Sequence, residues 1–424
     1  MVRFRGGPGY RWQVVALLWA CGFFNYADRQ ALMSVFPELA QEWGLSLTRL
    51  GMLGSAFMVV YALAAPFAGA IVDRWPRRAL IVGGLAFWSL ICAATGSAVG
   101  FLPLFWLRAA EGLGESCYFP ASMSLLADYH PRESRSRAMS LHQTSVYVGT
   151  AGGGILAGFL ADRYGWRQPF WALGLAGFVY AGLLWFLLVE APRGASDGKV
   201  KHEDWPRDDA IGGDRRRPLD DLRSILRHPS ACALLLAFAG ANFVAMALMT
   251  WLPTFVFQRF QTDLLTSATI GTFFFPMASL VGALIGGALG DASARHRSGG
   301  RMRVQGVALL LGAPCVFVAG TSGTVAVLVA ALIGIGLCKG VYDASIFASI
   351  YDVVDPSVRG TAAGLMNTIG WAGGSLAPLA LGLVGDRYGL SPAIAATAAA
   401  YLAAGLCAVG AGGLVRGGRE SNRR

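Results

Sequence analysis

Residues 102–127 decide the fold class, and they read LPLFWLRAAEGLGESCYFPASMSLLA. The stretch is long enough and apolar enough to cross a bilayer as a helix, apart from three charges. Arg108, Glu111 and Glu115 are spaced i, i+3 and i+7, which puts them on one face of a helix. A charge at the bilayer centre costs about 2.5–3.5 kcal/mol on insertion scales, so we expect these side chains to face a protein interior or a water-filled cavity. We interpret them as a substrate or proton site; the alternative is an internal ion pair that fixes helix packing.

The composition is that of a polytopic membrane protein. Only 14% of the residues are charged and 55% are apolar, with a mean hydropathy of +0.51, whereas soluble domains contain about 25% charged residues. The sequence predicts an all-α protein with twelve transmembrane helices in two six-helix bundles. The expected spans lie near residues 12–36, 49–72, 79–99, 102–127, 137–161, 169–190, 231–257, 266–290, 303–320, 324–350, 359–385 and 391–414.

The stretch 191–229 interrupts this pattern, because it is rich in charged residues and its apolar residues are scattered. We interpret it as a cytoplasmic connector with a short surface helix near Leu219–Arg227. It separates an N-terminal bundle over residues 1–190 from a C-terminal bundle over 230–414, and a tail follows over 415–424.

The distribution of positive charge predicts the orientation. Of the 35 Lys and Arg residues, 27 fall in segments that share one side of the membrane and five in segments on the other side. Because the basic side is normally cytoplasmic, we expect both termini to lie in the cytoplasm of a cell (inner or plasma) membrane. The net charge of +10 therefore reflects topology, and we expect no nucleic-acid partner.

A short motif, Gly-x-x-x-Asp, closes four of the expected spans. It occurs as Gly69 to Asp73, Gly158 to Asp162, Gly287 to Asp291 and Gly382 to Asp386. Two copies end on the cytoplasmic side and two on the other side, so each bundle reads as two inverted three-helix copies. This is the nested repeat plan of the major facilitator fold.

The loop Gly69–Arg78 resembles the signature that major facilitator proteins carry between helices 2 and 3, with Pro76 where the family usually has Gly. The resemblance implies a gate that holds the cytoplasmic side closed. The residues to which it assigns this role are Asp73, Arg74, Arg77 and Arg78. The alternative is that these charges only set the topology.

A finer resemblance lies in the segment Asn25–Arg29, together with Arg108 and the segment Gly112–Glu115. It is similar to the Spinster-like branch, known for lysophospholipid and sphingolipid transport. It is also similar to the anion:cation symporters, which take up sugar acids and other organic anions with protons. Phe87–Leu90 and Glu190–Gly194 are further Spinster-like features.

In both families the acidic residue of span 1 and the Glu of span 4 are implicated in proton coupling, and the arginines in carboxylate or phosphate contact. The resemblance therefore implies proton coupling by Asp28 and Glu115 and anion contact by Arg29 and Arg108. Because Arg108 and Glu115 share one helix face, we expect Arg108 to be the counter-charge of Glu115 until substrate binds Arg108. Glu111 is not part of the pattern, so its role stays open, with pairing to Arg108 as the simplest interpretation.

Other polar residues within the apolar spans are candidates for the substrate cavity. Lys339 and Asp343 are spaced i, i+4 in span 10 and can form a pair on one helix. The remaining candidates are Tyr26, Tyr118, His142 and Asn367. Structural hydrogen bonding is the alternative for each of them.

Together these features predict a proton-coupled secondary transporter that moves a small organic anion by alternating access. Spinster-like lipid transport, an uncoupled facilitator and a non-transporting membrane sensor are the alternatives. No enzyme motif is present, and the seven cysteines lack metal-ligand spacing. We therefore expect no catalysis, metal or cofactor, and a monomer whose partners are an anionic substrate, protons and the lipid bilayer.

Overall fold

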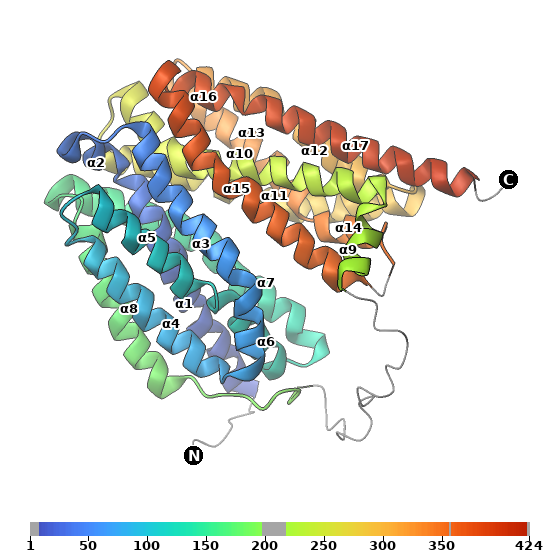
Figure 1. The fold of residues 1–424 in the computed structure, drawn as a ribbon, viewed down its shortest axis with the longest axis horizontal. Coiled ribbons are helices and arrows are strands. Elements are labelled where there is room, and N and C mark those ends of the chain that lie inside the picture. The colour runs from blue at the N-terminus through green and yellow to red at the C-terminus, as the bar shows by residue number, and fades with distance from the viewer. Residues whose placement is uncertain (1–7, 197–217, 356–357, 422–424) are drawn as a thin grey trace. The chain divides into compact units, whose positions relative to one another are not determined.

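The computed structural model describes residues 8–196, 218–355 and 358–421, and the regular elements in these ranges are helical (Figure 1). The helices before residue 197 are α1 (Pro8–Ser34), α2 (Phe36–Trp43), α3 (Leu47–Arg74), α4 (Arg77–Thr95), α5 (Phe101–Glu115), α6 (Tyr118–Tyr129), α7 (Arg132–Tyr164) and α8 (Gln168–Leu187). Those that follow are α9 (Pro218–Leu226), α10 (Pro229–Phe260), α11 (Leu264–His296), α12 (Gly300–Thr321), α13 (Val325–Asp343), α14 (Ile346–Tyr351), α15 (Arg359–Tyr388), α16 (Leu390–Ala396) and α17 (Ala398–Ser421).

Ten segments within the described residues are long and apolar enough to span a membrane. They correspond to α3, α4, α7, α8, α10, α11, α12, α13 with α14, α15, and α16 with α17. The other two expected spans are present as helices, α1 and the pair α5 and α6. Charged residues interrupt the apolar sequence of these helices: Asp28 and Arg29 in α1, and Arg108, Glu111 and Glu115 in α5.

The surface helix expected near Leu219–Arg227 is present as α9. Most of the remaining connector, residues 197–217, lies outside the described residues.

The repeat predicted from the Gly-x-x-x-Asp motif extends to the backbone. Helices α7 and α15 both end in Asp-Arg-Tyr-Gly, and the final glycines, Gly165 and Gly389, have φ values of 90° and 86°. Glycine adopts a positive φ without the steric cost that a side chain would add. The same four-residue sequence therefore ends both helices in the same way.

Two expected spans are interrupted at equivalent places. The fourth span breaks between α5, which ends at Glu115, and α6; the tenth breaks between α13, which ends at Asp343, and α14. Pro120 explains the first break, because it has no N–H to donate to the carbonyl of Ser116. Each interruption places an acidic residue at the end of a helix inside an apolar span.

The described residues form two compact units. The first comprises Met1–Val35 and Val59–Arg215, and the second Phe36–Met58 and Arg216–Arg424. Helix α2 and the beginning of α3 thus pack in the second unit, where a Cβ on Gly51 would lie 2.4 Å from the carbonyl oxygen of Pro378 in α15. The bundle boundaries expected from the sequence stay a prediction.

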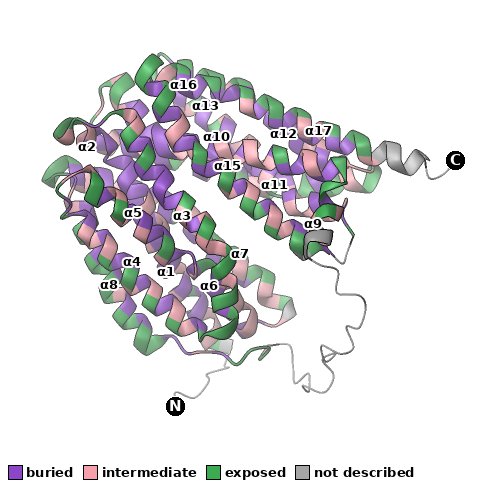
Figure 2. Ribbon diagram, viewed as in Figure 1, coloured by how far each residue is buried: buried purple, intermediate pink, exposed green. Residues whose placement is uncertain are grey.

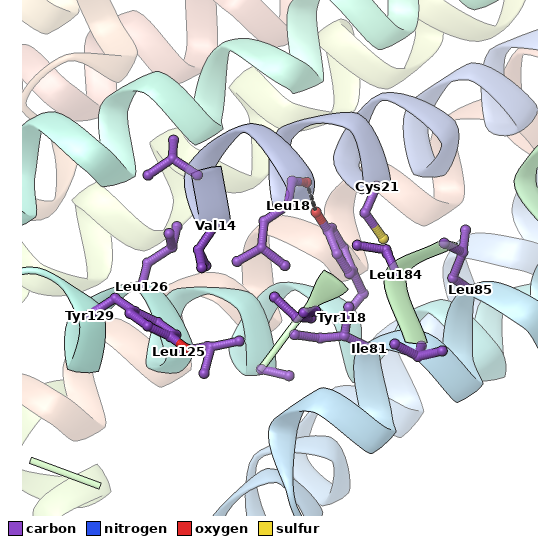
Figure 3. Packing of buried hydrophobic residues seen from close by; sticks show 14 of the residues in the cluster. Val14, Leu18, Cys21, Ile81, Leu85, Tyr118, Leu125, Leu126, Tyr129 and Leu184 are labelled. Carbon is purple, nitrogen blue, oxygen red and sulfur yellow. Dashed lines mark hydrogen bonds between the residues drawn. The ribbon is translucent and has the colours of Figure 1, made fainter. Parts of the chain in front are cut away.

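The core of the first unit is a cluster of aliphatic and aromatic side chains from α1, α4, α6 and α8 (Figure 3). Leu18, Leu85, Leu125 and Leu184 are fully buried in it. Large apolar residues such as Phe67 and Phe186 are instead exposed (Figure 2). Outward apolar side chains are what a helix surface facing lipid requires.

Candidate functional site

Two ion pairs lie in the interior of the first unit, one between α1 and α5 and one within α5. Arg29 of α1 donates from Nε to Oε2 of Glu115 at 2.5 Å, and its Nη2 contacts the same oxygen. Arg108 pairs through Nη1 with Glu111, three residues along α5. The three charges of the fourth span that were expected to face the protein interior do so: Arg108, Glu111 and Glu115 are each 1% exposed.

The pairing corrects one sequence-based expectation. We expected Arg108 to be the counter-charge of Glu115, since the two lie on one face of a single helix. In the structure, Glu115 forms its ion pair with Arg29 of α1, and Arg108 forms its ion pair with Glu111. Residues spaced i, i+3 on a helix are neighbours, whereas residues spaced i, i+7 are two turns apart. Arg108 therefore pairs with Glu111 rather than with Glu115.

Two tyrosines flank the Arg29 guanidinium. Its Cζ lies 4.8 Å from the ring centroid of Tyr26 and 5.0 Å from that of Tyr61. Both distances suit a cation–π contact, which orients the guanidinium as well as stabilising its charge. Tyr26 was expected at the site, whereas Tyr61 was missed because a tyrosine in an apolar span carries no signal of its partner.

Asp28 completes a cluster of three carboxyl groups. One oxygen from each of Asp28, Glu111 and Glu115 lies within 4.8 Å of the others, and all three residues are buried. Oδ1 of Asp28 has no hydrogen-bond donor among the described residues. This spacing would suit a small cation or a shared proton, but the guanidinium groups already offset two of the three negative charges.

Close helix packing supports this arrangement. A Cβ at Gly153 of α7 would lie 2.2 Å from Cα of Ala27, and one at Gly149 would lie 2.8 Å from the carbonyl oxygen of Phe23. Larger residues at these positions would therefore push α7 away from α1. These glycines allow α7 to pack closely against α1, which fixes the position of Asp28 and Arg29.

Tyr118 and His142 contact each other in the core beside α1. The Tyr118 hydroxyl donates to the carbonyl oxygen of Leu18 at 2.6 Å and lies 2.9 Å from Nε2 of His142. With its proton given to Leu18, the hydroxyl accepts from Nε2–H, which leaves Nδ1 of His142 as the unprotonated nitrogen. The two residues are thus brought together as a structural hydrogen-bonded pair.

Two of the remaining candidates lie in the second unit as one pair. Lys339 donates from Nζ to Oδ1 of Asp343 at 2.6 Å, and its ammonium lies 5.8 Å from the ring centroid of Tyr342. Lys339 is buried, whereas the Asp343 side chain is 37% exposed. The i, i+4 pair predicted from spacing is present.

Asn367 is exposed rather than buried in the second unit. With Asn242, Met246 and Trp371 it lines a small pocket of about 40 Å³.

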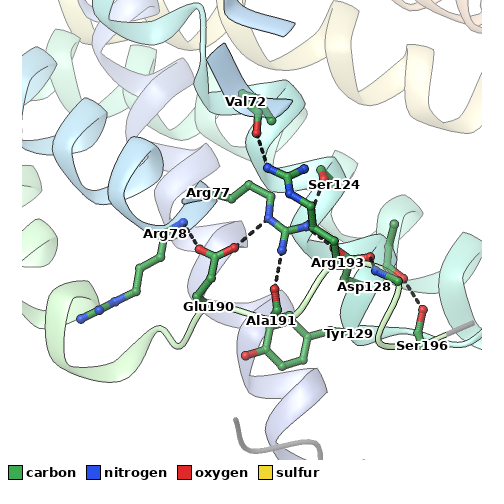
Figure 4. A network of polar contacts seen from close by, with 12 residues as sticks. Val72, Arg77, Arg78, Ser124, Asp128, Tyr129, Glu190, Ala191, Arg193 and Ser196 are labelled. Atoms are coloured by element: carbon green, nitrogen blue, oxygen red, sulfur yellow. Dashed lines mark hydrogen bonds and ion pairs between the residues drawn. The ribbon is translucent and has the colours of Figure 1, made fainter. Parts of the chain in front are cut away.

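Arg77 of the signature loop lies at the centre of a network of polar contacts (Figure 4). Its Nε donates to Glu190 at 2.8 Å, its Nη1 contacts Asp128 of α6, and its Nη2 donates to the carbonyl oxygen of Ala191. Arg78 adds a backbone contact to Glu190 at 2.6 Å. These contacts tie α4 to the end of α6 and to the chain after α8, all within the first unit.

Asp73 and Arg74, which were expected to join this cluster, are exposed. The observed ion pairs are made by Arg77 with Asp128 and Glu190 instead. Asp128 was not predicted, although an acidic residue at the end of an apolar span could have indicated it. Arg301 at the start of α12 repeats the pattern in the second unit, with Asp291 at 2.8 Å and Asp352 at 3.0 Å.

Comparison with known proteins connects this arrangement to one family. The chain is 32% identical over 267 residues to human protein spinster homolog 1, a match that covers 59% of this chain and 47% of the relative. The match thus spans about half the length of that relative. It is also 24% identical over 388 residues to the hexuronate transporter of Bacillus subtilis, covering 89% and 88% of the two chains. A probable L-galactonate transporter of Escherichia coli is 26% identical over 277 residues, covering 65% of this chain and 60% of the relative.

A solved structure shares the fold. The crystal structure of a bacterial homologue of the human lysosomal transporter Spinster, in an inward-facing and unoccupied conformation, aligns with a TM-score of 0.83 at 20% identity. The alignment covers 96% of this chain and 98% of that one. Residues 18–378 match the sequence profile of the Major Facilitator Superfamily. The chain is therefore a multi-pass membrane protein that belongs to the Major Facilitator Superfamily.

Proposed function

We propose that this protein is a proton-coupled transporter that moves a small organic anion of the sugar-acid class by alternating access. The observation that carries the proposal is the Arg29–Glu115 ion pair. Arg29 is held between two tyrosine rings, and its side chain is 13% exposed while that of Glu115 is fully buried. The guanidinium is thus the member of the pair that a ligand can reach.

If the substrate carboxylate replaced Glu115 as the partner of Arg29, substrate transport would be coupled to proton transport. A substrate carboxylate has the same planar shape as the Glu115 carboxylate and can accept the same charge-assisted hydrogen bonds. When substrate takes Arg29, Glu115 loses its counter-charge in a buried position, and binding a proton removes that cost. When substrate leaves, the pair forms again and the proton is released.

The relatives support the sugar-acid class over a lipid. The hexuronate transporter matches nearly the whole of this chain, whereas the spinster homologue matches 59% of it. The spinster match has the higher identity, 32% against 24%, so transport of a lysolipid is the second candidate. Both substrates carry an anionic group that Arg29 can bind.

Two further roles belong to the proposal. The signature residues Asp73, Arg74, Arg77 and Arg78 form a cytoplasmic gate, for which Arg77 supplies the fixed anchor on Asp128 and Glu190. Lys339 and Asp343 contribute charges from the second unit, at a helix end that corresponds to that of Glu115. The basic side, with both termini, faces the cytoplasm of a cell membrane.

The test is uptake of radiolabelled glucuronate into proteoliposomes. An imposed gradient of one pH unit, acidic outside, should drive accumulation to about ten-fold if one proton moves with one monoanion. Glu115→Gln imitates the protonated carboxyl, so it should retain counterflow without a gradient but lose accumulation. Accumulation by this variant would remove Glu115 as the coupling residue. Transport of lysophosphatidylcholine in place of glucuronate would favour the second candidate, and transport of neither would contradict the proposal.

A further inference from the structure

The buried cluster of α1 and α5 contains one more negative charge than positive charge. Its acidic members are Asp28, Glu111 and Glu115, and its basic members are Arg29 and Arg108. Both ion pairs are internal to the cluster, and all three carboxyl groups are at least nine-tenths buried. An uncompensated charge in such a place is costly and is normally removed by a proton or a counter-ion.

The contacts indicate where the excess charge lies. Glu115 accepts from two nitrogens of Arg29, and Glu111 accepts from Arg108. Among the residues that the structure describes, neither Oδ1 of Asp28 nor Oε1 of Glu111 has a hydrogen-bond donor, and both atoms are fully shielded. One carboxyl oxygen from each residue lies within 4.8 Å of the other. Two carboxylates this close in a buried site do not both stay ionised.

A neighbouring polar group also lacks a partner. Nδ2 of Asn25, one turn before Asp28 on α1, is buried and makes no hydrogen bond among the described residues. In the described part of the chain, the charged or titratable groups around Asp28 and Glu111 include Cys21, Tyr26 and Arg29 of α1, Tyr61 of α3, Cys92 of α4, and Arg108 and Glu115 of α5. The two arginines supply the positive charge of the cluster, and they are already engaged with Glu115 and Glu111.

We propose that Asp28 and Glu111 share one resident proton in the substrate-free protein, and that Glu111 is a further coupling residue. The proton neutralises the excess charge, so the empty cluster carries no net charge. Glu111 also holds Arg108 in an ion pair, which leaves Arg29 as the arginine that meets the substrate anion. The coupling role of Glu111 rests on the proposed function, proton-coupled transport of an organic anion.

A consequence for transport follows from the charge count. The empty cluster is neutral only with its resident proton, so raising the pH until that proton dissociates would leave a net negative charge that repels an anion. Without the Glu111 carboxyl, two acidic groups face two arginines and no resident proton is needed. Glu111→Gln should therefore move the upper pH limit of substrate counterflow to a higher pH.

The direct test is infrared spectroscopy of the detergent-purified full-length protein without substrate. A protonated carboxyl group has a carbonyl stretching band that is separate from the bands of the carboxylate. Wild type should show such a band near neutral pH, and it should disappear in Glu111→Gln and in Asp28→Asn. It should persist in Asp162→Asn, which alters an exposed carboxylate.

The outcomes separate this inference from the transport proposal. A band that persists unchanged in both Glu111→Gln and Asp28→Asn would overturn the shared proton. Absence of any such band in wild type, with or without sodium in the buffer, would also overturn it. A band that sodium removes would assign the site to a cation rather than a proton. Because no substrate is present, failure to transport glucuronate has no bearing on the result.

The pH profile of counterflow distinguishes coupling from a structural role. If Glu111 only holds Arg108 in place, Glu111→Gln should lower activity at every pH without moving the upper limit of the profile. If Glu111→Gln does not fold, Asp28→Asn replaces it in the infrared measurement, with the same expected loss of the band. A profile whose upper limit does not move would contradict the coupling role.

Discussion

Arg29 of α1 contacts a single oxygen of Glu115 in α5, Oε2, through both its Nε and its Nη2. The second carboxylate oxygen, Oε1, has no hydrogen-bond donor among the described residues. The pair is therefore not the two-oxygen fork that gives arginine–carboxylate contacts their greatest strength. A ligand carboxylate that offers both oxygens can compete with Glu115 for the guanidinium.

The first prediction concerns the shape of the Arg29 side chain. Arg29→Lys keeps the positive charge but loses the planar fork and its contacts with Tyr26 and Tyr61. We expect glucuronate binding to weaken about 5- to 30-fold, which corresponds to about 1–2 kcal/mol. Isothermal titration of the purified protein measures the effect. The exposed Arg227→Lys is the control, and equal affinity in the two variants would exclude Arg29 from the anion site.

The second prediction concerns the stability of the signature loop. Arg77→Ala leaves Asp128 and Glu190 facing a buried space without their cation. We expect a loss of about 2–4 kcal/mol, below the largest values for buried pairs because Glu190 is partly exposed. Thermal unfolding in detergent measures it. Arg74→Ala, in an exposed neighbour, should change stability by less than about 0.5 kcal/mol; similar losses in both variants would contradict the anchoring role of Arg77.

The third prediction concerns the cap on α3 in the second unit. Asp386 accepts hydrogen bonds from the backbone N–H groups of Leu47 and Thr48 at 2.8 and 2.9 Å. Asp386→Asn removes the negative charge at the helix N-terminus and should cost about 1 kcal/mol. Asp162 occupies the same place in the repeated motif and is likewise exposed, but it accepts no such hydrogen bonds among the described residues, so Asp162→Asn should leave the unfolding temperature nearly unchanged.

The fourth prediction concerns pH. His130 lies between α6 and α7, where burial lowers the pKa of its imidazole. Its Nε2 lies 3.2 Å from the carbonyl oxygen of Arg11, and its Nδ1 lies 3.2 Å from the hydroxyl of Ser134. Since the folded pKa lies below that of the unfolded chain, the unfolded state binds more protons as pH falls through about 6.5, and stability is lost.

The measurement is the unfolding temperature of the purified protein from neutral to mildly acidic pH. His130→Gln should reduce the decline on acidification, whereas His296→Gln, which alters an exposed histidine, should not. An unchanged pH dependence in His130→Gln would show that other groups cause the decline.

Much of the fold was predictable from sequence because its signals are local. Apolar length reports the thickness of the bilayer, so each expected span is found as a helix or as a pair of helices. The repeated Gly-x-x-x-Asp motif indicated the internal repeat, and Gly165 and Gly389 show its conformational basis. The spacing of Lys339 and Asp343 was enough to predict their ion pair, because four residues make about one helical turn.

The charged residues of the candidate site and the Arg108–Glu111 pair were predictable from the sequence, but the pairing of Arg29 with Glu115 was not. Asp28, Arg29, Arg108 and Glu115 were recognisable because charges are costly in an apolar span. Which carboxylate each arginine binds depends on the relative position of α1 and α5, whose paired residues Arg29 and Glu115 are 86 positions apart. The position of α1 is set by close packing, including the contact of Gly153 with Ala27. The periodicity of a single helix contains no information about how two helices pack.

The sequence by itself determined the membrane-spanning helices, the internal repeat and the set of charges within the apolar spans, because each follows from hydrophobic length or helical spacing along one segment. Only the tertiary structure decided that Arg29 binds Glu115, and that Oδ1 of Asp28 lies beside Glu111 without a donor among the described residues. The physical reason is that burial and ion pairing in this cluster depend on distances between helices. Those distances come from packing across the whole unit.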